Sequence, residues 1–192
     1  MFTNTIHTVP TAYAAIEAAG RAIAFSMPSD LQTGALLQTL VAAKPGARVL
    51  EIGTGTGLAT AWLLAGMDAE STLLSLDTSA EFQAIAHEKL GNDSRLTLLC
   101  TDAGDWLEMA QEAQFDLIFA DAWPGKYANL HAALNSLAKG GLYVIDDMLA
   151  QPNWPAGHEA NVTKLVAELE SRTDIHLVKM AWSTGIVLAT KK

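Results

Sequence analysis

The chain has 192 residues, a formal net charge of -9, and a composition in which 50% of the residues are hydrophobic and 17% are charged. So apolar a composition excludes an intrinsically disordered chain, and the acidic surplus argues against binding to the phosphate backbone of nucleic acids. The single cysteine, Cys100, excludes a disulfide framework and a cysteine-rich zinc site.

The first apolar segment, residues 11–27, is too interrupted to cross a membrane. Glu17 and Arg21 break it, whereas a membrane-spanning helix needs about 18 or more consecutive apolar residues. Residues 1–4 also lack the basic character of a secretory signal. We therefore expect a cytoplasmic protein that acts on a small molecule and binds neither nucleic acid nor a membrane.

A helical region is expected before the first strand. Residues 11–27 contain five residues whose spacing would place them on one face of a helix: Tyr13, Ile16, Gly20, Ile23 and Met27. Residues 30–42 have the pattern of a second helix. Residues 1–45 are therefore predicted as a helical prelude that packs on the remainder of one domain, residues 1–192.

Beyond residue 45, short β-rich segments alternate with segments of helical length. The expected strands are 48–52, 72–77, 95–100, 115–120 and 141–146, and the expected helices between them are 58–66, 80–90, 103–113 and 127–138. Such alternation is typical of βαβ units and of a parallel sheet covered on both faces. Ser79 and Asp102 are expected as helix N-caps, and Lys139-Gly140-Gly141 as a helix stop.

The C-terminal segment departs from this alternation. A helix over 158–171 is followed by strands over 175–182 and 186–190, joined by the turn Ser183-Thr184-Gly185. The predicted fold is therefore α/β, a Rossmann-like doubly wound sheet that is mostly parallel and is completed by an antiparallel C-terminal hairpin strand.

The most informative segment, residues 49–57, ends a strand and opens a helix with the spacing G-x-G-x-G. Glycines Gly53, Gly55 and Gly57 let the backbone turn sharply and let a ligand approach the main-chain N–H groups. A dinucleotide fingerprint needs glycine or alanine where this chain has Leu58, so an NAD-dependent oxidoreductase is a remote alternative. The spacing, with Glu51 two residues before it, favours S-adenosylmethionine, whose cationic end gains from a nearby carboxylate.

Carboxylates also follow the next two strands. Asp77, followed by Thr78, ends the second strand where it can accept hydrogen bonds from both ribose hydroxyls of a nucleoside. Asp102, followed by Ala103, ends the third strand, where it can accept from an adenine amino group. The alternative is that both aspartates only cap helices.

These residues resemble a class I S-adenosylmethionine-dependent methyltransferase, and within that superfamily the O-methyltransferases of the catechol and caffeoyl-CoA type. The resemblance covers nearly the whole chain and is carried by VLEIGTGTG, Asp77, Asp102, FDLIFADAWPGKY and GGLYVIDD. It implies a seven-stranded sheet in the order 3-2-1-4-5-7-6. It also implies contacts from the backbone around Ser26 and Met27 to the methionine part of the cofactor, and a homodimer.

The resemblance further implies a divalent metal, usually magnesium, held at the ends of the fourth and fifth strands. The matching residues here are Asp121, Asp146 and Asp147, and their hard oxygen donors suit magnesium. Asp147 replaces the asparagine of the family. The alternative is that Asp146 and Asp147 form a solvated strand end, while Asp121 positions the cofactor.

A second departure concerns the general base. The family has a lysine three residues after the first metal-binding aspartate, but the chain has Pro124 there and Lys126 two residues later. Tyr127 matches a family tyrosine. A turn at Pro124-Gly125 would aim Lys126 into the site, so Lys126 and Asp121 are the predicted catalytic residues; the alternative is a solvent-facing lysine at a helix start.

Aromatic residues on loops suggest the walls of an acceptor site. Trp123, which is also assigned to the cofactor site, and Trp154 could sandwich a flat ligand, or they could simply cover the core. His158 is expected at the surface and Cys100 in the core.

The predicted function is therefore methyl transfer from S-adenosylmethionine to a small molecule, with metal-dependent O-methylation favoured. The alternatives are a metal-independent N- or S-methyltransferase and a cofactor-binding protein without catalysis. The methyl acceptor cannot be identified from the sequence, because acceptor loops vary independently of the cofactor frame.

Overall fold

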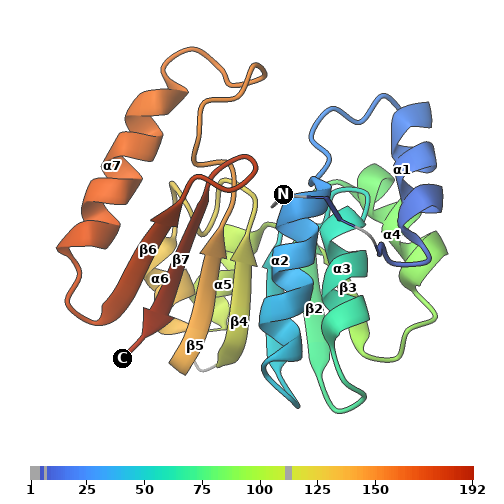
Figure 1. Cartoon of the computed structure of the whole chain (residues 1–192), viewed down its shortest axis with the longest axis horizontal. Helices are drawn as coiled ribbons and strands as arrows, with labels where there is room; N and C mark the ends of the chain where they lie inside the picture. The colour runs from blue at the N-terminus through green and yellow to red at the C-terminus, as the bar shows by residue number, and fades with distance from the viewer. Residues whose placement is uncertain (1–4, 7, 111–113) are drawn as a thin grey trace.

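The computed structural model describes residues 5–6, 8–110 and 114–192. Within these residues, seven strands form one sheet in the order β3-β2-β1-β4-β5-β7-β6 (Figure 1). In chain order the strands are β1 (Arg48–Ile52), β2 (Thr72–Asp77), β3 (Leu96–Cys100), β4 (Phe115–Ala120), β5 (Leu137–Ile145), β6 (Ile175–Met180) and β7 (Ile186–Lys191). β7 pairs antiparallel with both β5 and β6, and the other pairs are parallel. The predicted α/β fold and strand order are confirmed.

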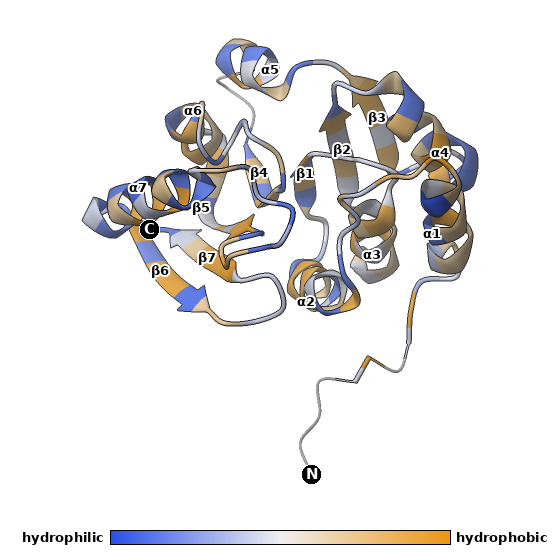
Figure 2. Cartoon of the chain, turned by 90° about the horizontal axis from the view of Figure 1, so that it is seen from above, coloured by the Kyte–Doolittle hydropathy of each residue, from blue (hydrophilic) through white to orange (hydrophobic). Residues whose placement is uncertain are grey.

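Helices cover both faces of the sheet (Figure 2). They are α1 (Tyr13–Ala22), α2 (Leu31–Ala42), α3 (Leu58–Gly66), α4 (Ala80–Leu90), α5 (Ala103–Met109), α6 (Leu130–Asn135) and α7 (His158–Ser171). α5, α6 and α7 share one hydrophobic cluster with the sheet, while α2 and α3 share the cluster on the opposite face. The central strands β1 and β4 lie between these layers and are mostly buried, which explains why their sequences are almost continuously apolar.

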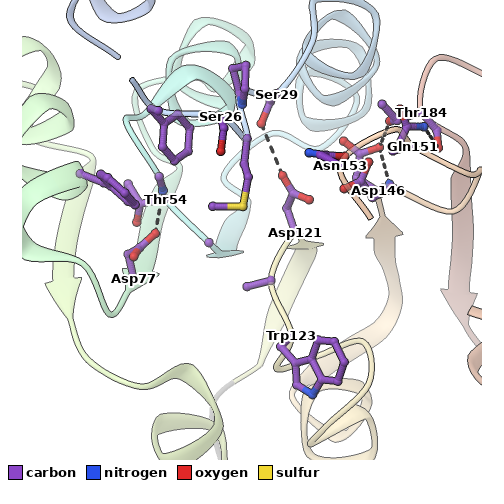
Figure 3. A pocket seen from close by; sticks show the side chains of 18 of the residues that line it. Ser26, Ser29, Thr54, Asp77, Asp121, Trp123, Asp146, Gln151, Asn153 and Thr184 are labelled. Carbon is purple, nitrogen blue, oxygen red and sulfur yellow. Dashed lines mark hydrogen bonds between the residues drawn. The ribbon is translucent and has the colours of Figure 1, made fainter. Parts of the chain in front are cut away.

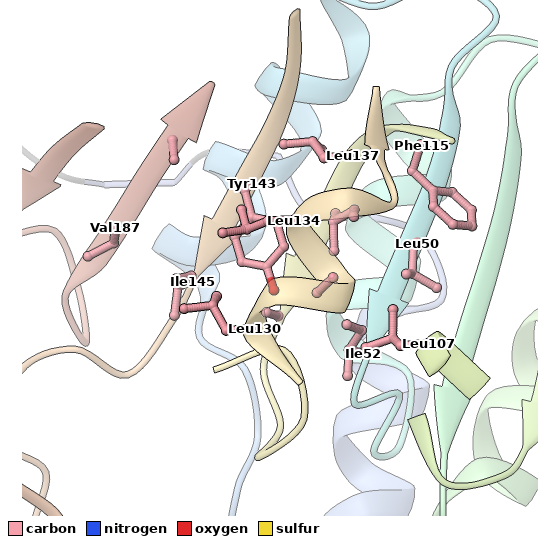
Figure 4. Packing of buried hydrophobic residues seen from close by; sticks show 14 of the residues in the cluster. Leu50, Ile52, Leu107, Phe115, Leu130, Leu134, Leu137, Tyr143, Ile145 and Val187 are labelled. Atoms are coloured by element: carbon pink, nitrogen blue, oxygen red, sulfur yellow. The ribbon is translucent and has the colours of Figure 1, made fainter. Parts of the chain in front are cut away.

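Tyr143 stands at the centre of the cluster under α5, α6 and α7 (Figure 4). Its ring is fully buried, and its hydroxyl donates to the carbonyl oxygen of Gly125 at 2.6 Å. A buried tyrosine hydroxyl needs such a partner. The same bond therefore ties the loop after β4 to the middle of β5.

The helical prelude packs mainly on α3. Asp30 caps α2 by accepting from the backbone N–H groups of Gln32 and Thr33, and Gly34 lets α2 approach Trp62 of α3. A Cβ at Gly34 would lie 2.2 Å from the Trp62 ring. The ring of Trp62, almost fully buried, also meets Tyr13 of α1 edge-on. Helix α2 thus packs on α3, and α1 packs on both α3 and α4.

The predicted helical stripe over 11–27 is wrong at its C-terminal end. Helix α1 ends at Ala22, where Ala24 adopts a φ of 56°, and Phe25 N–H donates back to the Gly20 carbonyl oxygen. Pro28 follows, and the residue before a proline is disfavoured in a helix. Ile23 and Met27 are consequently 37% and 62% exposed instead of lying on a buried face.

The predicted helix stop at Lys139-Gly140-Gly141 is also wrong. Helix α6 spans only Leu130–Asn135, and β5 already begins at Leu137, so the two glycines lie within a strand. Gly140 has a φ of 75°, and the register of β4 against β5 shifts between Phe115 and Leu117. The glycines therefore accommodate an irregular start of β5 rather than the end of a helix.

Four smaller outcomes complete the fold. Ser79 and Asp102 cap α4 and α5 as predicted. Cys100 is exposed rather than buried, because β3 is an edge strand. Helix α5 ends at Met109, and residues 111–113 of the predicted helix lie outside the described residues. In the described ranges, no helix combines the length and apolar character needed to cross a bilayer.

Candidate functional site

The glycine loop lies between the carboxyl end of β1 and the start of α3. The N–H groups of Gly53 and Thr54 donate to the Leu76 carbonyl oxygen at 2.9 and 3.1 Å, which fixes the loop to the end of β2. Gly53 has a φ of 104°, and a Cβ there would lie 2.9 Å from the backbone oxygen of Asp121. Only glycine satisfies both the left-handed conformation and this close approach.

Asp77 connects the loop to the end of β2. Its Oδ2 accepts from the N–H of Gly55 at 2.7 Å, and its Oδ1 accepts from the N–H of Ser79 at 2.8 Å. A carboxylate oxygen can accept more than one hydrogen bond. Both oxygens of Asp77, which lines the cavity described below, therefore retain capacity for the hydroxyls of a bound nucleoside.

Glu51 lies beneath the loop and does not line the cavity. The side chain is fully buried, and its Oε2 accepts from the hydroxyls of Thr60 and Ser75. Ser75 in turn bonds to Thr54, so the network supports the loop from below. Burial raises the pKa of Glu51 to about 8, which favours the neutral acid at pH 7. The predicted direct electrostatic contact to a cationic cofactor does not match this position.

Three other residues predicted to bind the cofactor lie outside the cavity lining: Gly57, Asp102 and Ala103. Gly57 packs against α4, where a Cβ would lie 2.8 Å from Ala86 Cβ. Oδ1 of Asp102 caps α5 by accepting from the N–H groups of Gly104 and Asp105. The adenine contact of Asp102 stays a prediction.

A cavity of about 540 Å³ lies at the carboxyl ends of the strands. It extends from the glycine loop and Asp77 to the ends of β4 and β5, and the segment from Phe25 to Asp30 forms part of its wall. Residues predicted from sequence that line it are Met27, Gly53, Thr54, Gly55, Asp77, Thr78, Asp121, Trp123, Lys126, Asp146 and Asp147. The fold thus brings the predicted cofactor and catalytic residues into a single space.

Asp121 and Asp146 face this cavity from neighbouring parallel strands (Figure 3). Asp121 directly follows β4, and its Oδ2 accepts from the Ser29 hydroxyl at 3.5 Å. Asp146 directly follows β5 and is only 3% exposed. Its Oδ1 accepts from the Thr184 hydroxyl and, at 2.8 Å, from the N–H of Asp147.

Lys126 lies between these two aspartates. Its side chain is 5% exposed, and its Nζ lies 3.3 Å from Asp121 Oδ1 and donates to the Asp146 carbonyl oxygen at 2.8 Å. The turn at Pro124-Gly125 brings it there, because Gly125 at φ 83° bonds to the Ala128 carbonyl oxygen. The alternative of a solvent-facing lysine is therefore wrong.

Burial dominates the electrostatics of the acidic residues. It raises the pKa of Asp146 to about 7, and it raises the pKa values of Asp121 and Asp147 while Lys126 opposes the shift of each. The alternative of a solvated strand end at Asp146 and Asp147 fails for Asp146, which is buried. Asp147 is half-buried and adopts a φ of 64°.

The predicted magnesium site does not fit this arrangement. Magnesium requires several oxygen atoms that converge on one point. In residues 5–6, 8–110 and 114–192, no three His, Cys, Asp or Glu side chains are arranged to hold a metal ion. A lysine ammonium already contacts Asp121 and the backbone of Asp146.

An aromatic wall closes the cavity beyond Lys126 and consists of Trp123, Tyr127, Trp154 and His158. The hydroxyl of Tyr127 and Nε2 of His158 are 3.1 Å apart. The His158 ring also packs against Tyr127 at 5.0 Å and against Trp154 at 4.7 Å between centroids. His158, which opens α7, was expected at the surface but lines the cavity.

Sequence reasoning missed a second group of lining residues: Phe25, Ser29, Phe82 and Thr184. Phe25 packs edge-on against Phe82 at 4.8 Å between ring centroids, and it covers the glycine loop. Ser29 and Thr184 each donate to one of the buried aspartates. No signal in the sequence indicated Ser29 and Thr184, because the aspartates to which they donate lie 92 and 38 residues away.

Comparison with known proteins identifies the family. Residues 50–148 match the family model described as a methyltransferase domain. A curated Mycobacterium leprae protein, provisionally named an O-methyltransferase, is 30% identical over 153 residues, which cover 73% of this chain and 68% of the relative.

Solved structures share the whole architecture. A Klebsiella pneumoniae protein, also provisionally named an O-methyltransferase, superposes with a TM-score of 0.82 at 27% identity, over 97% of this chain and 92% of its own. An O-methyltransferase from Bacillus cereus in complex with SAH gives a TM-score of 0.84 at 20% identity, over 98% and 94% of the two chains. The resemblance drawn from the glycine loop and the strand-end aspartates is therefore confirmed, and the chain belongs to the family of class I methyltransferase domains.

Proposed function

We propose that the protein transfers a methyl group from S-adenosylmethionine (SAM) to an oxygen atom of a small molecule. The observation that carries the proposal is one continuous cavity, which joins the Gly55–Asp77 hydrogen bond at its one end to the Lys126–Asp121 pair at the other. One end suits a nucleoside and the other a polar acceptor. The names of the similar proteins, O-methyltransferases, support the same assignment.

The donor groups around the glycine loop suit SAM. Asp77 offers two carboxylate oxygens to the ribose hydroxyls, with Thr78 beside it. Asp121 offers negative charge to the cationic end of SAM, and the backbone from Ser26 to Met27 adjoins the methionine part. We propose that Asp102 and Ala103 contact the adenine. We place Trp123 at the border between the cofactor and the acceptor.

When bound, SAM supplies a methyl group on a positively charged sulfur; the acceptor oxygen takes this methyl group as the carbon–sulfur bond breaks, and the bond's electron pair stays on sulfur. No residue has to protonate the leaving thioether. The protein must hold the acceptor oxygen in line with the methyl carbon and exclude water, which is a contribution of proximity. The remaining requirement is to remove the proton of the acceptor hydroxyl.

Lys126 and Asp121 are the two residues that we assign to this task. Lys126 donates to Asp121 Oδ1 and to the Asp146 carbonyl oxygen, so its N–H groups act here as hydrogen-bond donors. We therefore assign Lys126 to hold the acceptor oxygen and Asp121 to receive its proton. Burial raises the pKa of Asp121, which strengthens it as a base.

The aromatic wall suits a flat acceptor. Trp123 is 52% exposed and packs on Tyr127 at 4.8 Å between ring centroids. Nε1 of Trp154 and Nδ1 of His158 are buried without a hydrogen-bond partner among the described residues. We propose a hydroxylated aromatic compound as the acceptor class, because its ring can stack while its hydroxyl reaches Lys126.

The test combines binding with turnover. Isothermal titration with SAM and with S-adenosylhomocysteine (SAH) measures the cofactor site, and mass spectrometry follows methylated product over a panel of phenols, amines and thiols. We expect both ligands to bind and phenols to be methylated. Methylated amines or thiols alone would replace the O-methyltransferase assignment with the N- or S-methyltransferase alternative. Binding without any product would favour a protein without catalysis.

Two further expectations remain proposals of their own. We propose a cytoplasmic location and a homodimer, which fractionation of cells and sedimentation of the purified protein would test. The divalent cation predicted from the sequence is not part of the proposed reaction, because Lys126 contacts the carboxylate of Asp121 and the backbone carbonyl oxygen of Asp146, which belong to two of the three residues that were predicted to bind it.

A further inference from the structure

The point where a divalent cation was predicted already has a positive charge. Asp121 and Asp146 follow neighbouring parallel strands, so their side chains and backbone ends converge. Nζ of Lys126 lies between them, 3.3 Å from Asp121 Oδ1 and 2.8 Å from the Asp146 carbonyl oxygen. With 5% exposure, this ammonium is a fixed part of the interior rather than a mobile surface group.

Several of the neighbouring oxygen atoms already accept hydrogen bonds from protein donors. Oδ1 of Asp146 accepts from the Thr184 hydroxyl and from the N–H of Asp147. Oδ2 of Asp121 accepts from Ser29. A metal ion needs several oxygens that converge on it, and with Lys126 in place the part of the chain that the structure describes offers no group of three His, Cys, Asp or Glu residues arranged for this purpose.

Charge reinforces the effect of geometry. A divalent cation near Asp121 and Asp146 would face the ammonium of Lys126 inside a buried region, where repulsion is poorly screened. The two cations would also compete for the same Asp121 carboxylate. The geometry thus admits one of them at a time.

The loop after β4 holds the lysine in place. Gly125 adopts a φ of 83°, and its carbonyl oxygen accepts from the buried Tyr143 hydroxyl at 2.6 Å. A Cβ at Gly125 would lie 2.9 Å from that hydroxyl. The N–H groups of Lys126 and Tyr127 both donate to the Trp123 carbonyl oxygen, at 3.3 and 3.0 Å. The backbone therefore directs Lys126 inward.

We propose that the Lys126 ammonium takes the place of the divalent cation, so that the site functions without metal. An ammonium has three N–H donors, and the contacts to Asp121 and Asp146 use two of them. The third is available to the acceptor oxygen in the cavity that Lys126 lines. This last step rests on the proposed function, whereas the exclusion of metal does not.

The test measures metal binding directly. Mn²⁺ is titrated into the wild-type protein, Lys126→Ala and Lys126→Arg, and free Mn²⁺ is followed by electron paramagnetic resonance. We expect no saturable site in the wild type or in Lys126→Arg, which keeps the positive charge. We expect Lys126→Ala to gain one site per chain, and Asp146→Asn in the Lys126→Ala background to lose it again.

The control is Lys179→Ala. Lys179 is an exposed lysine near the end of β6 that pairs with Glu170, so its removal should create no metal site. Circular dichroism checks that Lys126→Ala folds; if it does not, Lys126→Gln, which keeps most of the side-chain volume, replaces it. One-to-one Mn²⁺ binding by the wild type that Asp146→Asn abolishes would overturn the proposal. A folded Lys126→Ala that gains no site would overturn it as well.

Affinity for SAH, measured on the same samples, separates this inference from the proposed function. A wild type that binds neither SAH nor Mn²⁺ contradicts the methyltransferase mechanism and leaves the exclusion of metal supported. A wild type that binds SAH together with Mn²⁺ contradicts only the inference. Where product is formed, a chelator should leave the rate of the wild type unchanged.

Discussion

The two ends of the cavity are formed by different kinds of chemical groups. At the ends of β1 and β2, the site consists of backbone N–H groups, glycines with positive φ and one half-buried carboxylate, Asp77. At the ends of β4 and β5, it consists of charged side chains in the interior, Asp121, Lys126 and Asp146, and of an aromatic wall. The first end depends on the shape of the main chain, and the second depends on long-range side-chain contacts.

This difference separates the consequences of substitution. A change at the cofactor end should affect folding and cofactor affinity together, because the same backbone atoms serve both. A change at the acceptor end should affect turnover or acceptor affinity while the cofactor still binds. The predictions below are arranged to test that separation.

The largest effect is expected for Gly53→Ala. The new Cβ would meet the backbone oxygen of Asp121 at 2.9 Å in a residue whose φ is 104°. Left-handed strain and overpacking each cost about 1–3 kcal/mol, so we expect a loss of about 3 kcal/mol in unfolding free energy and no measurable SAH binding. Urea denaturation and calorimetric titration provide the measurements.

Gly46→Ala is the matched control for Gly53→Ala. Gly46 also has a positive φ, of 67°, but a Cβ there would meet nothing within 4 Å. Only the conformational strain remains, so we expect a loss of about 1 kcal/mol with unchanged SAH affinity. Equal losses at the two glycines would refute the importance of the contact with Asp121.

The second prediction concerns Asp77→Asn. Both carboxylate oxygens accept backbone N–H groups, so an amide nitrogen would face a donor and a ribose hydroxyl would lose a charged acceptor. We expect the dissociation constant of SAH to rise about 100-fold, equivalent to about 2.7 kcal/mol. Calorimetric titration at constant pH and salt measures it.

Asp68→Asn provides the comparison at the opposite end of the sheet. Asp68 likewise accepts the N–H groups of Gly46 and Ser71, before β1 and β2 begin. Its substitution should leave SAH affinity unchanged. If Asp68→Asn weakened SAH binding as strongly as Asp77→Asn, a general loss of protein stability, rather than the loss of a ribose contact, would explain both results.

The same division decides what the sequence could predict. Most strands and helices and the glycine loop were predictable, because the period of apolar residues and the G-x-G-x-G spacing are local signals. The strand order followed from the resemblance to the class I methyltransferases. The turn at Pro124-Gly125 was likewise predictable from a local signal. The start of β5 at Leu137 was not, since the pairing of β4 with β5 and the buried Tyr143 outweighed the local signal of Gly140-Gly141.

The acceptor end shows why residue type and spacing were insufficient. Three aspartates at strand ends suggested a metal, yet the decisive feature is the direction of Lys126, which the Gly125–Tyr143 hydrogen bond helps to set. His158 joins the wall through Tyr127, 31 residues earlier in the chain. Neither contact leaves a pattern along the sequence.

The third prediction concerns pH and Glu51→Gln. Burial raises the pKa of Glu51 to about 8 in the folded protein, above the value of about 4.3 for an unfolded glutamate. The native state then binds one proton more than the unfolded state between these values, so the stability contributed by this proton is present below pH 4.3 and is lost as the pH rises to about 8. Glutamine does not titrate.

We therefore expect Glu51→Gln to gain about 2.6 kcal/mol of stability relative to the wild type between pH 5 and pH 7. Denaturation curves at several pH values measure the difference. A difference independent of pH would contradict a neutral buried Glu51.

The smallest effect is expected for Tyr127→Phe at the acceptor end. The substitution removes only the hydroxyl that pairs with His158 Nε2 at 3.1 Å and leaves the ring contacts with Trp123 and His158. One such hydrogen bond contributes about 1 kcal/mol, so the KM for the acceptor should rise about fivefold while SAH affinity stays constant. Tyr13→Phe, in α1 outside the cavity lining, should change neither value. A Tyr127→Phe variant that lost SAH affinity instead would mean that the aromatic wall serves the cofactor, and the separation between the two ends of the cavity would fail at that residue.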